Sequence, residues 1–168
     1  MTTTSVILGG ARTPIGRFGS SLASLAAVDL GAVAIREALA RSGVEPASVD
    51  YVVMGQVLQA GTGQITARQA AIAAGLPREV PAITINKVCL SGLNAVAMAD
   101  QMIRAGEADV VVAGGMESMS QAPYLLPKAR EGLRIGDGQV VDSLIHDGLW
   151  STFTKQHMGE SSDAINRE

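Results

Sequence analysis

Short apolar segments of strand length recur through the first 115 residues of the chain. One of them, DVVVAGG, is a continuous valine run of the kind found in strands that are covered on both faces. Runs of this length and composition, bounded by glycine or helical segments, predict buried strands. The four predicted strands are residues 5–10, 50–57, 82–86 and 109–115.

Amphipathic segments lie between these strands and predict helices. In residues 27–42 the apolar side chains recur at 4–3–4 spacing with charged side chains opposite them, and Gly43 ends the pattern. A second helix is predicted after Thr66, which can cap it, and Gly75 ends it. Residues 90–105 form the third predicted helix. Alternating strands and helices imply βαβ crossovers, so the fold class is α/β with a largely parallel sheet.

The third predicted helix is apolar around almost its whole circumference. From Leu93 onward its apolar residues are interrupted only by Asn94, Asp100, Gln101 and Arg104. A helix of this kind is expected inside a protein, packed on more than one side. One sheet covers one side, so we expect a second layer, which the rest of the sequence does not obviously supply.

The regular pattern ends after Gly115. Residues 116–160 contain prolines, glycines, scattered charges and only short apolar runs. Irregular segments this long are uncommon unless they are functional or belong to a larger assembly. The last residues, SSDAINRE, predict the start of a helix with Ser161 or Ser162 as its cap. We interpret the chain as the front portion of a longer protein.

Composition narrows the class of protein. Of the 168 residues 17% are charged, below the roughly 25% that is usual in soluble domains. The chain therefore buries more surface than a free domain of this size, or it relies on a partner. Its net charge of −3 provides no basic field for nucleic acid or anionic lipid. No apolar run approaches the roughly 18 residues of a membrane helix, so we predict neither a nucleic-acid nor a membrane partner.

Cys89 is the only cysteine of the chain, which excludes an internal disulfide. With no signal-peptide core at the start, this predicts a cytoplasmic protein. The residue stands where a predicted strand gives way to the third predicted helix. The unpaired N–H groups of a helix's first turn favour a thiolate and can bind an oxyanion, and Gly92 allows a substrate to approach closely. These features suit a nucleophile that takes up an acyl group. An inert packing cysteine is the alternative, and position alone favours it.

Five segments carry a more specific signal, because they occur together in a fixed order and spacing. They are ARTPIGRFGSSL (11–22), GQVLQAGTGQITARQAA (55–71), INKVCLSGLNAVAMA (85–99), VVAGGMESMSQAPY (111–124) and DGLWSTFTKQHMGESSD (147–163). In these segments the chain resembles the N-terminal part of the thiolases, the family of acetyl-CoA acetyltransferase and 3-ketoacyl-CoA thiolase. The resemblance runs from about residue 5 to the end.

The resemblance implies both a fold and a reaction. The expected fold is a thiolase-like N-terminal α/β domain at residues 1–117, with a mostly parallel mixed sheet and helices on both faces. The start of a loop domain follows at residues 118–168. Cys89 lies in the family's N-x-x-C-x-S-G motif, which implies that it is the nucleophile of an acyl-CoA C-acyltransferase acting in condensation or thiolytic cleavage. Leu90 replaces the glycine or alanine of many members, which puts the preferred acyl chain length in doubt.

The same resemblance implies substrate contacts. His157 and Met158 match the family's His-Met pair that lines the pocket for the acyl group and the pantetheine arm, and Leu149 aligns with another pocket residue. His146 matches no assigned position, and we predict it at the surface. No cluster of His, Cys, Asp or Glu has metal-ligand spacing, and the glycine-rich segments fit no nucleotide-binding motif. We therefore predict no metal and no cofactor, with CoA and acyl-CoA as substrates.

The family's remaining catalytic groups belong to motifs further along its chains. These are an asparagine in an N-E-A-F-type motif, a histidine in G-H-P and a second cysteine in C-x-G, and none occurs here. We therefore expect the nucleophile-bearing half of a thiolase, which does not turn over by itself, and a homodimer or homotetramer for the complete protein. Two alternatives stay open: a non-catalytic half that acts as a partner subunit or scaffold, and another condensing enzyme such as a ketoacyl synthase.

Overall fold

The computed structural model describes residues 4–167 of the chain. By its internal contacts the chain forms two compact units, Met1–Gln121 and Ala122–Glu168, and each is described by itself. In the first unit, Ser118 Oγ donates to the carbonyl of Leu25, and Ser120 Oγ accepts a hydrogen bond from the amide of Gly19. The assignment of domains with a boundary after residue 117 stays a prediction.

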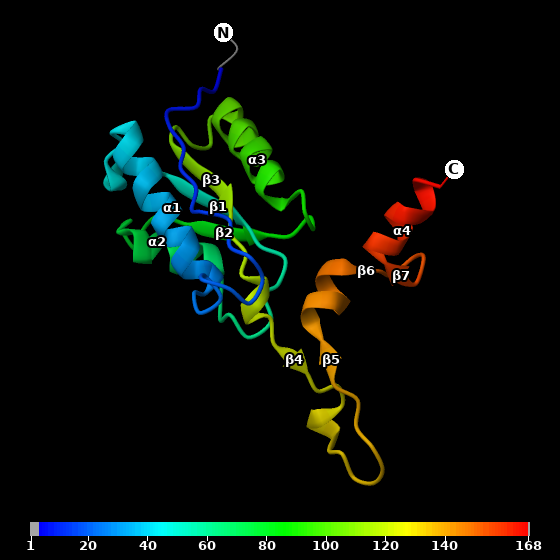
Figure 1. The fold of residues 1–168 in the computed structure, drawn as a ribbon. Helices are drawn as coiled ribbons and strands as arrows, with labels where there is room; N and C mark the ends of the chain where they lie inside the picture. The colour runs from blue at the N-terminus through cyan, green and yellow to red at the C-terminus, as the bar shows by residue number, and fades with distance from the viewer. Residues whose placement is uncertain (1–3, 168) are drawn as a thin grey trace. The chain divides into compact units, whose positions relative to one another are not determined.

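A parallel sheet of three strands forms the centre of the first unit (Figure 1). Its strands lie in the order β2–β1–β3, and Val52 in the central strand pairs with Ala82 and Val112. Each strand falls within one of the predicted apolar runs, so the α/β class with a parallel sheet is confirmed. The strands are β1 (Tyr51–Gly55), β2 (Ala82–Ile85) and β3 (Val111–Gly115).

Three helices cover the two faces of this sheet. They are α1 (Ala27–Ser42), α2 (Thr66–Ala74) and α3 (Ser91–Ala105). The connection through α2 leads from β1 to one edge of the sheet, and the connection through α3 leads back to the other edge. Right-handed crossovers in opposite directions place these two helices on opposite faces, as Figure 1 shows. α1 packs against α2, and the main core lies between this pair and the sheet.

α3 buries only one stripe of its surface. Its buried residues are the small Ser91, Ala95 and Ala99, whereas Leu93 and Val96 keep 66% and 41% of their surfaces exposed. Within residues 4–121, the described part of the first unit, no second layer covers this outer side of the helix. The helix therefore presents an apolar face that the sequence predicts to be enclosed.

Residues 5–10, which we predicted as a strand, form none. Val6, Ile7 and Leu8 are exposed, and the segment is held by a hydrogen bond from the hydroxyl of Ser5 to the carboxylate of Asp100 in α3. A cavity of about 570 Å³ lies between this segment, β3 and the helices α1 and α3. A strand needs a hydrogen-bonded neighbour as well as an apolar sequence, and β3 pairs only with β1 among the described strands.

The predicted cap of the second helix is also wrong. Ile65 is the N-cap of α2, and Thr66 is its first helical residue. Thr84 of β2 supplies the capping oxygen instead, because its Oγ1 accepts the amide of Ala67 at 2.8 Å and lies 3.2 Å from Thr66 Oγ1. A cap from a neighbouring strand leaves no mark on the local spacing of the helix sequence.

Asp50, directly before β1, joins β1 to the start of β3. Its Oδ2 accepts the amides of Val110 at 2.9 Å and Asp109 at 2.8 Å, and its own amide donates to the carbonyl of Val110. The hydrogen bonds from Val110 and Asp109 lower the pKa of the Asp50 carboxyl.

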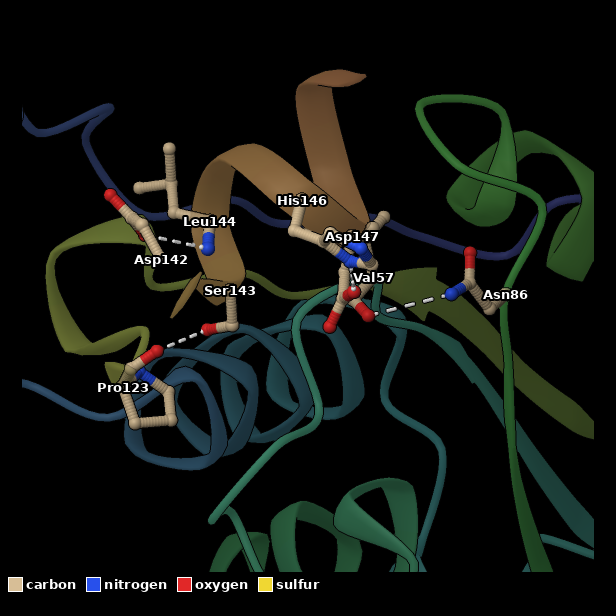
Figure 2. Close-up of polar contacts among 8 residues, drawn as sticks. All are labelled: Val57, Asn86, Pro123, Asp142, Ser143, Leu144, His146 and Asp147. Carbon is tan, nitrogen blue, oxygen red and sulfur yellow. Dashed lines mark hydrogen bonds and ion pairs between the residues drawn. The ribbon is translucent and has the colours of Figure 1, made fainter. Parts of the chain in front are cut away.

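The second unit contains short elements joined by loops. β4 (Tyr124–Leu125) pairs antiparallel with β5 (Val141–Asp142), and β6 (Trp150–Ser151) pairs antiparallel with β7 (Gln156–His157). A π-helical segment, η4 (Leu144–Leu149), lies between β5 and β6. The amide of Leu144 donates to Asp142 Oδ1 at 2.9 Å, and Ser143 Oγ donates to the carbonyl of Pro123, so the entry to η4 is fixed (Figure 2). Short 3₁₀ turns lie at Pro46–Ser48, Met119–Gln121 and Ala129–Glu131.

The last helix begins earlier than the sequence predicts. α4 (Met158–Ile165) has His157 as its N-cap, whose Nδ1 accepts the amide of Gly159 at 3.1 Å. Ser161 and Ser162, the predicted caps, lie inside the helix. An imidazole ring nitrogen accepts a hydrogen bond as a serine oxygen does, but histidine is not among the usual capping residues.

Candidate active site

Cys89 lies on an exposed turn between β2 and α3. Leu90 is the N-cap of the helix, and Ser91 is its first residue. The turn thus places the thiol just ahead of the helix, at the junction that the sequence predicts. The buried position that an inert packing cysteine requires is not observed.

The residue before Cys89 has a backbone conformation that side chains rarely adopt. Val88 has a φ of 49°, in the left-handed region, where a β-branched side chain is strained. Such conformations cost on the order of 1–3 kcal/mol and persist only where the surroundings hold them. The strain lies on the residue that sets the direction in which Cys89 leaves the strand.

Two polar side chains hold this strained turn. Asn86 Oδ1 accepts the amide of Val88 at 2.9 Å. Ser91, which is only 4% exposed, accepts the amide of Lys87 at 2.7 Å and donates to the carbonyl of Val88 at 2.6 Å. The asparagine and the serine that flank the cysteine in sequence therefore bind the strained residue from its amide side and its carbonyl side.

Three glycines bring the turn close to the carboxyl ends of the strands. A Cβ on Gly55, the last residue of β1, would lie 2.6 Å from the Cβ of Ser91 and 2.7 Å from the amide nitrogen of Gly92. A Cβ on Gly115, the last residue of β3, would lie 3.3 Å from the Cα of Gly92. β1 is also the central strand, beside which the chain reverses direction across the sheet, because the crossover from β1 leads to β2 at one edge and the crossover from β2 leads back past β1 to β3 at the other edge. In α/β proteins, ligands bind outside the carboxyl ends of the strands at such a point.

Three backbone amides at this turn donate no hydrogen bond to any acceptor in residues 4–167. They belong to Cys89, Gly92 and Leu93. The first N–H groups of a helix lack intrahelical partners and carry partial positive charge. Because they lie close to Cys89 in the sequence, these donors can stabilise the negative charge of its thiolate or of an oxyanion.

Glu117 is a polar group at the same edge of the sheet that sequence reasoning missed. It follows β3, and its Oε2 accepts the amide of Val57 at 2.8 Å while its Oε1 accepts that of Leu58 at 3.3 Å. Burial raises the pKa of Glu117, and hydrogen bonds from the amides of Val57, Leu58 and Ser118 counter part of this effect. The available sequence signal was a single acidic residue two positions after the predicted strand at 109–115.

The second unit brings the three predicted substrate-contact residues together. His157 pairs with Trp150 across β6 and β7, Leu149 directly precedes Trp150, and Met158 directly follows His157. Leu149 and His157 are half-buried, and Met158 is exposed. Cys89 belongs to the first unit, and the meeting of all four residues in one pocket stays a prediction.

His146 lies on the surface of the second unit, in η4. Its Nδ1 is 2.7 Å from Asp147 Oδ1, and both side chains are largely open to solvent (Figure 2). Residues 4–167 contain no group of three His, Cys, Asp or Glu side chains placed to hold a metal ion. In the same part of the chain, no helix combines the length and apolarity needed to cross a membrane.

Comparisons with known proteins agree on one family. A family model described as "Thiolase, N-terminal domain" matches residues 5–168. A probable acetyl-CoA acetyltransferase of Mycolicibacterium smegmatis is 58% identical over 161 residues, which make up 96% of this chain and 42% of that protein. The acetyl-CoA acetyltransferase of Cupriavidus necator is 56% identical over 163 residues, or 97% of this chain and 42% of that protein.

A solved structure gives the same result for the fold. The crystal structure of Acat5 thiolase from Ascaris suum, in complex with coenzyme A, matches with a TM-score of 0.91 and 43% sequence identity. The match covers 96% of this chain and 42% of that chain. This chain therefore spans less than half the length of the relatives that it matches.

Proposed function

This chain belongs to the thiolase family, and we propose that its Cys89 is the nucleophile that accepts an acyl group from acyl-CoA, or from 3-ketoacyl-CoA in the cleavage direction. The observation that carries this proposal is the exposed thiol on a strained turn, which Asn86 and Ser91 hold at the start of α3. Strain of this kind is maintained where a reactive group has to be aimed. A cysteine that only fills space needs no such arrangement.

The proposed step is transfer of the acyl group from one sulfur to another. The thiolate of Cys89 adds to the thioester carbonyl, forming a bond between Sγ and the carbonyl carbon and moving negative charge to the oxygen. When this adduct collapses, the bond to the CoA sulfur breaks, and CoA leaves as a thiolate that takes up the proton lost by Cys89. The unpartnered amides of Cys89, Gly92 and Leu93 are the donors that this chain offers to the oxyanion.

We assign the recognition of the acyl group and the pantetheine arm to Leu149, His157 and Met158. Their closeness along the backbone supports this role, because His157 pairs with Trp150 across β6 and β7, and Leu149 and Met158 directly flank this pair. The coenzyme A in the solved thiolase supports CoA as the leaving group. His157 accepts a hydrogen bond from the amide of Gly159, which fixes its ring for contact with a substrate.

The second half of the reaction needs groups that this chain does not contain. A condensing thiolase requires a base to deprotonate the second substrate, and no motif for it occurs in the sequence. The relatives have more than half of their length beyond the matched region. We propose that these 168 residues carry the nucleophile, do not turn over alone, and act in the cytoplasm within a complete homodimeric or homotetrameric enzyme of fatty acid metabolism.

Intact-mass spectrometry after incubation with acetyl-CoA tests the proposal. We expect one acetyl group per chain, located on the peptide that contains Cys89, and no acetylation of the Cys89→Ala variant. The His146→Ala variant is the matched control, because it alters an exposed residue outside the site and should be acetylated like the wild type. Acetylation of another residue in Cys89→Ala would contradict the assignment. The assignment would also be contradicted if the wild-type chain stayed unacetylated both alone and in complex with the C-terminal portion of the Mycolicibacterium smegmatis relative.

One observation favours a second arrangement, in which the chain is a non-catalytic partner subunit. The outer side of α3 exposes Leu93 and Val96, as expected for a surface that another polypeptide covers. Labelling with iodoacetamide separates the two functions, because an activated and accessible Cys89 reacts even at mildly acidic pH. The matched relatives named acetyl-CoA acetyltransferase support a thiolase over a ketoacyl synthase.

A further inference from the structure

Glu117 is a half-buried carboxylate that forms no ion pair within residues 4–167. The groups that its two oxygens accept are the backbone amides of Val57 and Leu58, in the loop that follows β1. Removing a carboxylate from water is unfavourable unless it is hydrogen-bonded, and each acceptor oxygen here has a donor. Glu117 therefore fixes the loop that begins after Gly55.

This loop and the strand before it both reach the turn of Cys89. The carbonyl of Val57 accepts the side-chain amide of Asn86 at 3.4 Å, as Figure 2 shows, and Asn86 in turn accepts the amide of Val88. Gly55, at the end of β1, packs directly against Ser91. The loop thus contacts Asn86, and the last residue of β1 contacts Ser91, the two side chains that hold the strained residue before Cys89.

We infer that Glu117 is a positioning residue for Cys89. Its carboxylate fixes the amides of Val57 and Leu58, and with them the carbonyl that orients Asn86. Asn86 then holds Val88 in the left-handed conformation that sets the direction of the thiol. The inference rests on the proposed role of Cys89 as nucleophile, but it concerns the reactivity of the thiol, which can be measured without any acyl transfer.

A purely structural role for Glu117 predicts a different result. In that case the carboxylate only joins the ends of β1 and β3, and its loss lowers the unfolding temperature without affecting the thiol through Asn86. The two roles separate in a double-mutant cycle, because residues that act through one another do not have independent effects.

The experiment measures the second-order rate constant for alkylation of Cys89 by iodoacetamide, at a temperature well below unfolding. Cys89 is the only cysteine, so the label reports on it alone. The variants are Glu117→Gln, Asn86→Ala and their combination. Glu107→Gln is the matched control, since Glu107 is exposed near the far end of α3 and its side chain forms no hydrogen bond within residues 4–167. Unfolding temperatures are recorded for all variants.

We expect Glu117→Gln and Asn86→Ala each to slow alkylation by about tenfold, from the loss of one hydrogen bond to a charged group or to a strained backbone. The double variant should be no slower than the slower single variant, and Glu107→Gln should match the wild type. A wild-type rate in Glu117→Gln overturns the inference, and so do independent effects that multiply to about a hundredfold. If Glu117→Gln does not fold, Glu117→Asp replaces it, with the carboxylate kept but its reach shortened.

Acetylation by acetyl-CoA, measured separately, distinguishes failure of this inference from failure of the proposed function. If the alkylation rates show coupling between Glu117 and Asn86 but the chain is never acetylated, the positioning role of Glu117 stands and the proposed acyl transfer is refuted. If the wild type is acetylated but Glu117→Gln is alkylated at the wild-type rate, the proposed function stands and the positioning role of Glu117 is refuted.

Discussion

Replacement of Gly55 by alanine tests the close approach between β1 and the turn of Cys89. A Cβ at this position would lie 2.6 Å from both the Cβ and the carbonyl carbon of Ser91, and 2.7 Å from the amide nitrogen of Gly92. Two of these three atoms belong to the backbone, so rotation of a side chain cannot relieve the contact. Either β1 or the first turn of α3 has to move.

The size of the effect follows from overpacking at a rigid site. Inserting a methyl group into a packed interior costs about 1–3 kcal/mol, and more where the backbone has to shift. The lower conformational entropy of alanine in the unfolded chain offsets about 0.4–1 kcal/mol of this. We expect Gly55→Ala to lower the free energy of unfolding by about 2 kcal/mol. For a chain of this size that loss corresponds to a fall in Tm of about 4–8 °C.

Urea unfolding followed by circular dichroism measures this loss, with Gly114→Ala as the matched control. A Cβ on Gly114 would meet only the flexible side chain of Met54, at 3.5 Å from its sulfur, which is an ordinary contact. Gly114→Ala should therefore keep the wild-type stability, while Gly55→Ala loses stability and also slows the alkylation of Cys89. Equal stability of the two variants would refute the close approach, and with it the account of how the sheet supports the turn.

Two further predictions concern pH and have opposite signs. Hydrogen bonds hold the pKa of Asp50 below its ordinary value of 3.8, so the stability that this carboxylate contributes is present above that value and is lost as the pH falls through the lower, folded-state pKa. Urea unfolding of Asp50→Asn should show a deficit relative to the wild type at pH 6 that disappears at acidic pH, and a deficit independent of pH contradicts this. Burial holds the pKa of Glu117 above its ordinary value of 4.5, so its contribution is fully present below pH 4.5 and is lost as the pH rises through the folded-state pKa. The stability of the wild type relative to Glu117→Gln should fall over that rise, and a relative stability that increases with pH would show that the hydrogen bonds from Val57 and Leu58 outweigh burial.

The sequence predicts those elements that a local pattern defines. The helix predicted at 27–42 coincides with α1 at both ends, because its amphipathic spacing and Gly43 lie within the helix and at its end. Prediction failed where a distant group decides the structure. Residues 5–10 have the composition of a strand but no hydrogen-bonded neighbour, and α2 takes its cap from Thr84 on β2. The sequence of residues 5–10 does not reveal whether a neighbouring strand is present, and the sequence of α2 does not reveal that Thr84 caps it.

In the candidate site, too, the sequence predicts some features and misses those that depend on distant residues. The order of the elements alone puts Cys89 at a junction between a strand and a helix, where it is observed. The contact of Glu117 with Val57 joins residues 60 positions apart, and no local pattern indicates it. The roles of Leu149, His157 and Met158 depend on the resemblance to the thiolases and stay predictions. Their adjacency across β6 and β7 depends on a pairing that the irregular sequence of this region does not reveal.

The geometry gives a physical reason for the spacing of the N-x-x-C-x-S-G residues. The asparagine has to be two residues before Val88 for its side chain to accept the Val88 amide, and the serine has to be three residues after it to bind the Val88 carbonyl from the first turn of the helix. The close approach of β3 constrains Gly115 more than Gly92, since a Cβ on Gly115 would lie 3.3 Å from the Cα of Gly92, whereas a Cβ on Gly92 would make ordinary contacts at 3.7 Å. Leu90 is under none of these constraints, since it contributes only backbone to the turn and its side chain is exposed. This position can therefore vary without loss of the turn, and variation there changes the surroundings of the thiol while its support stays the same.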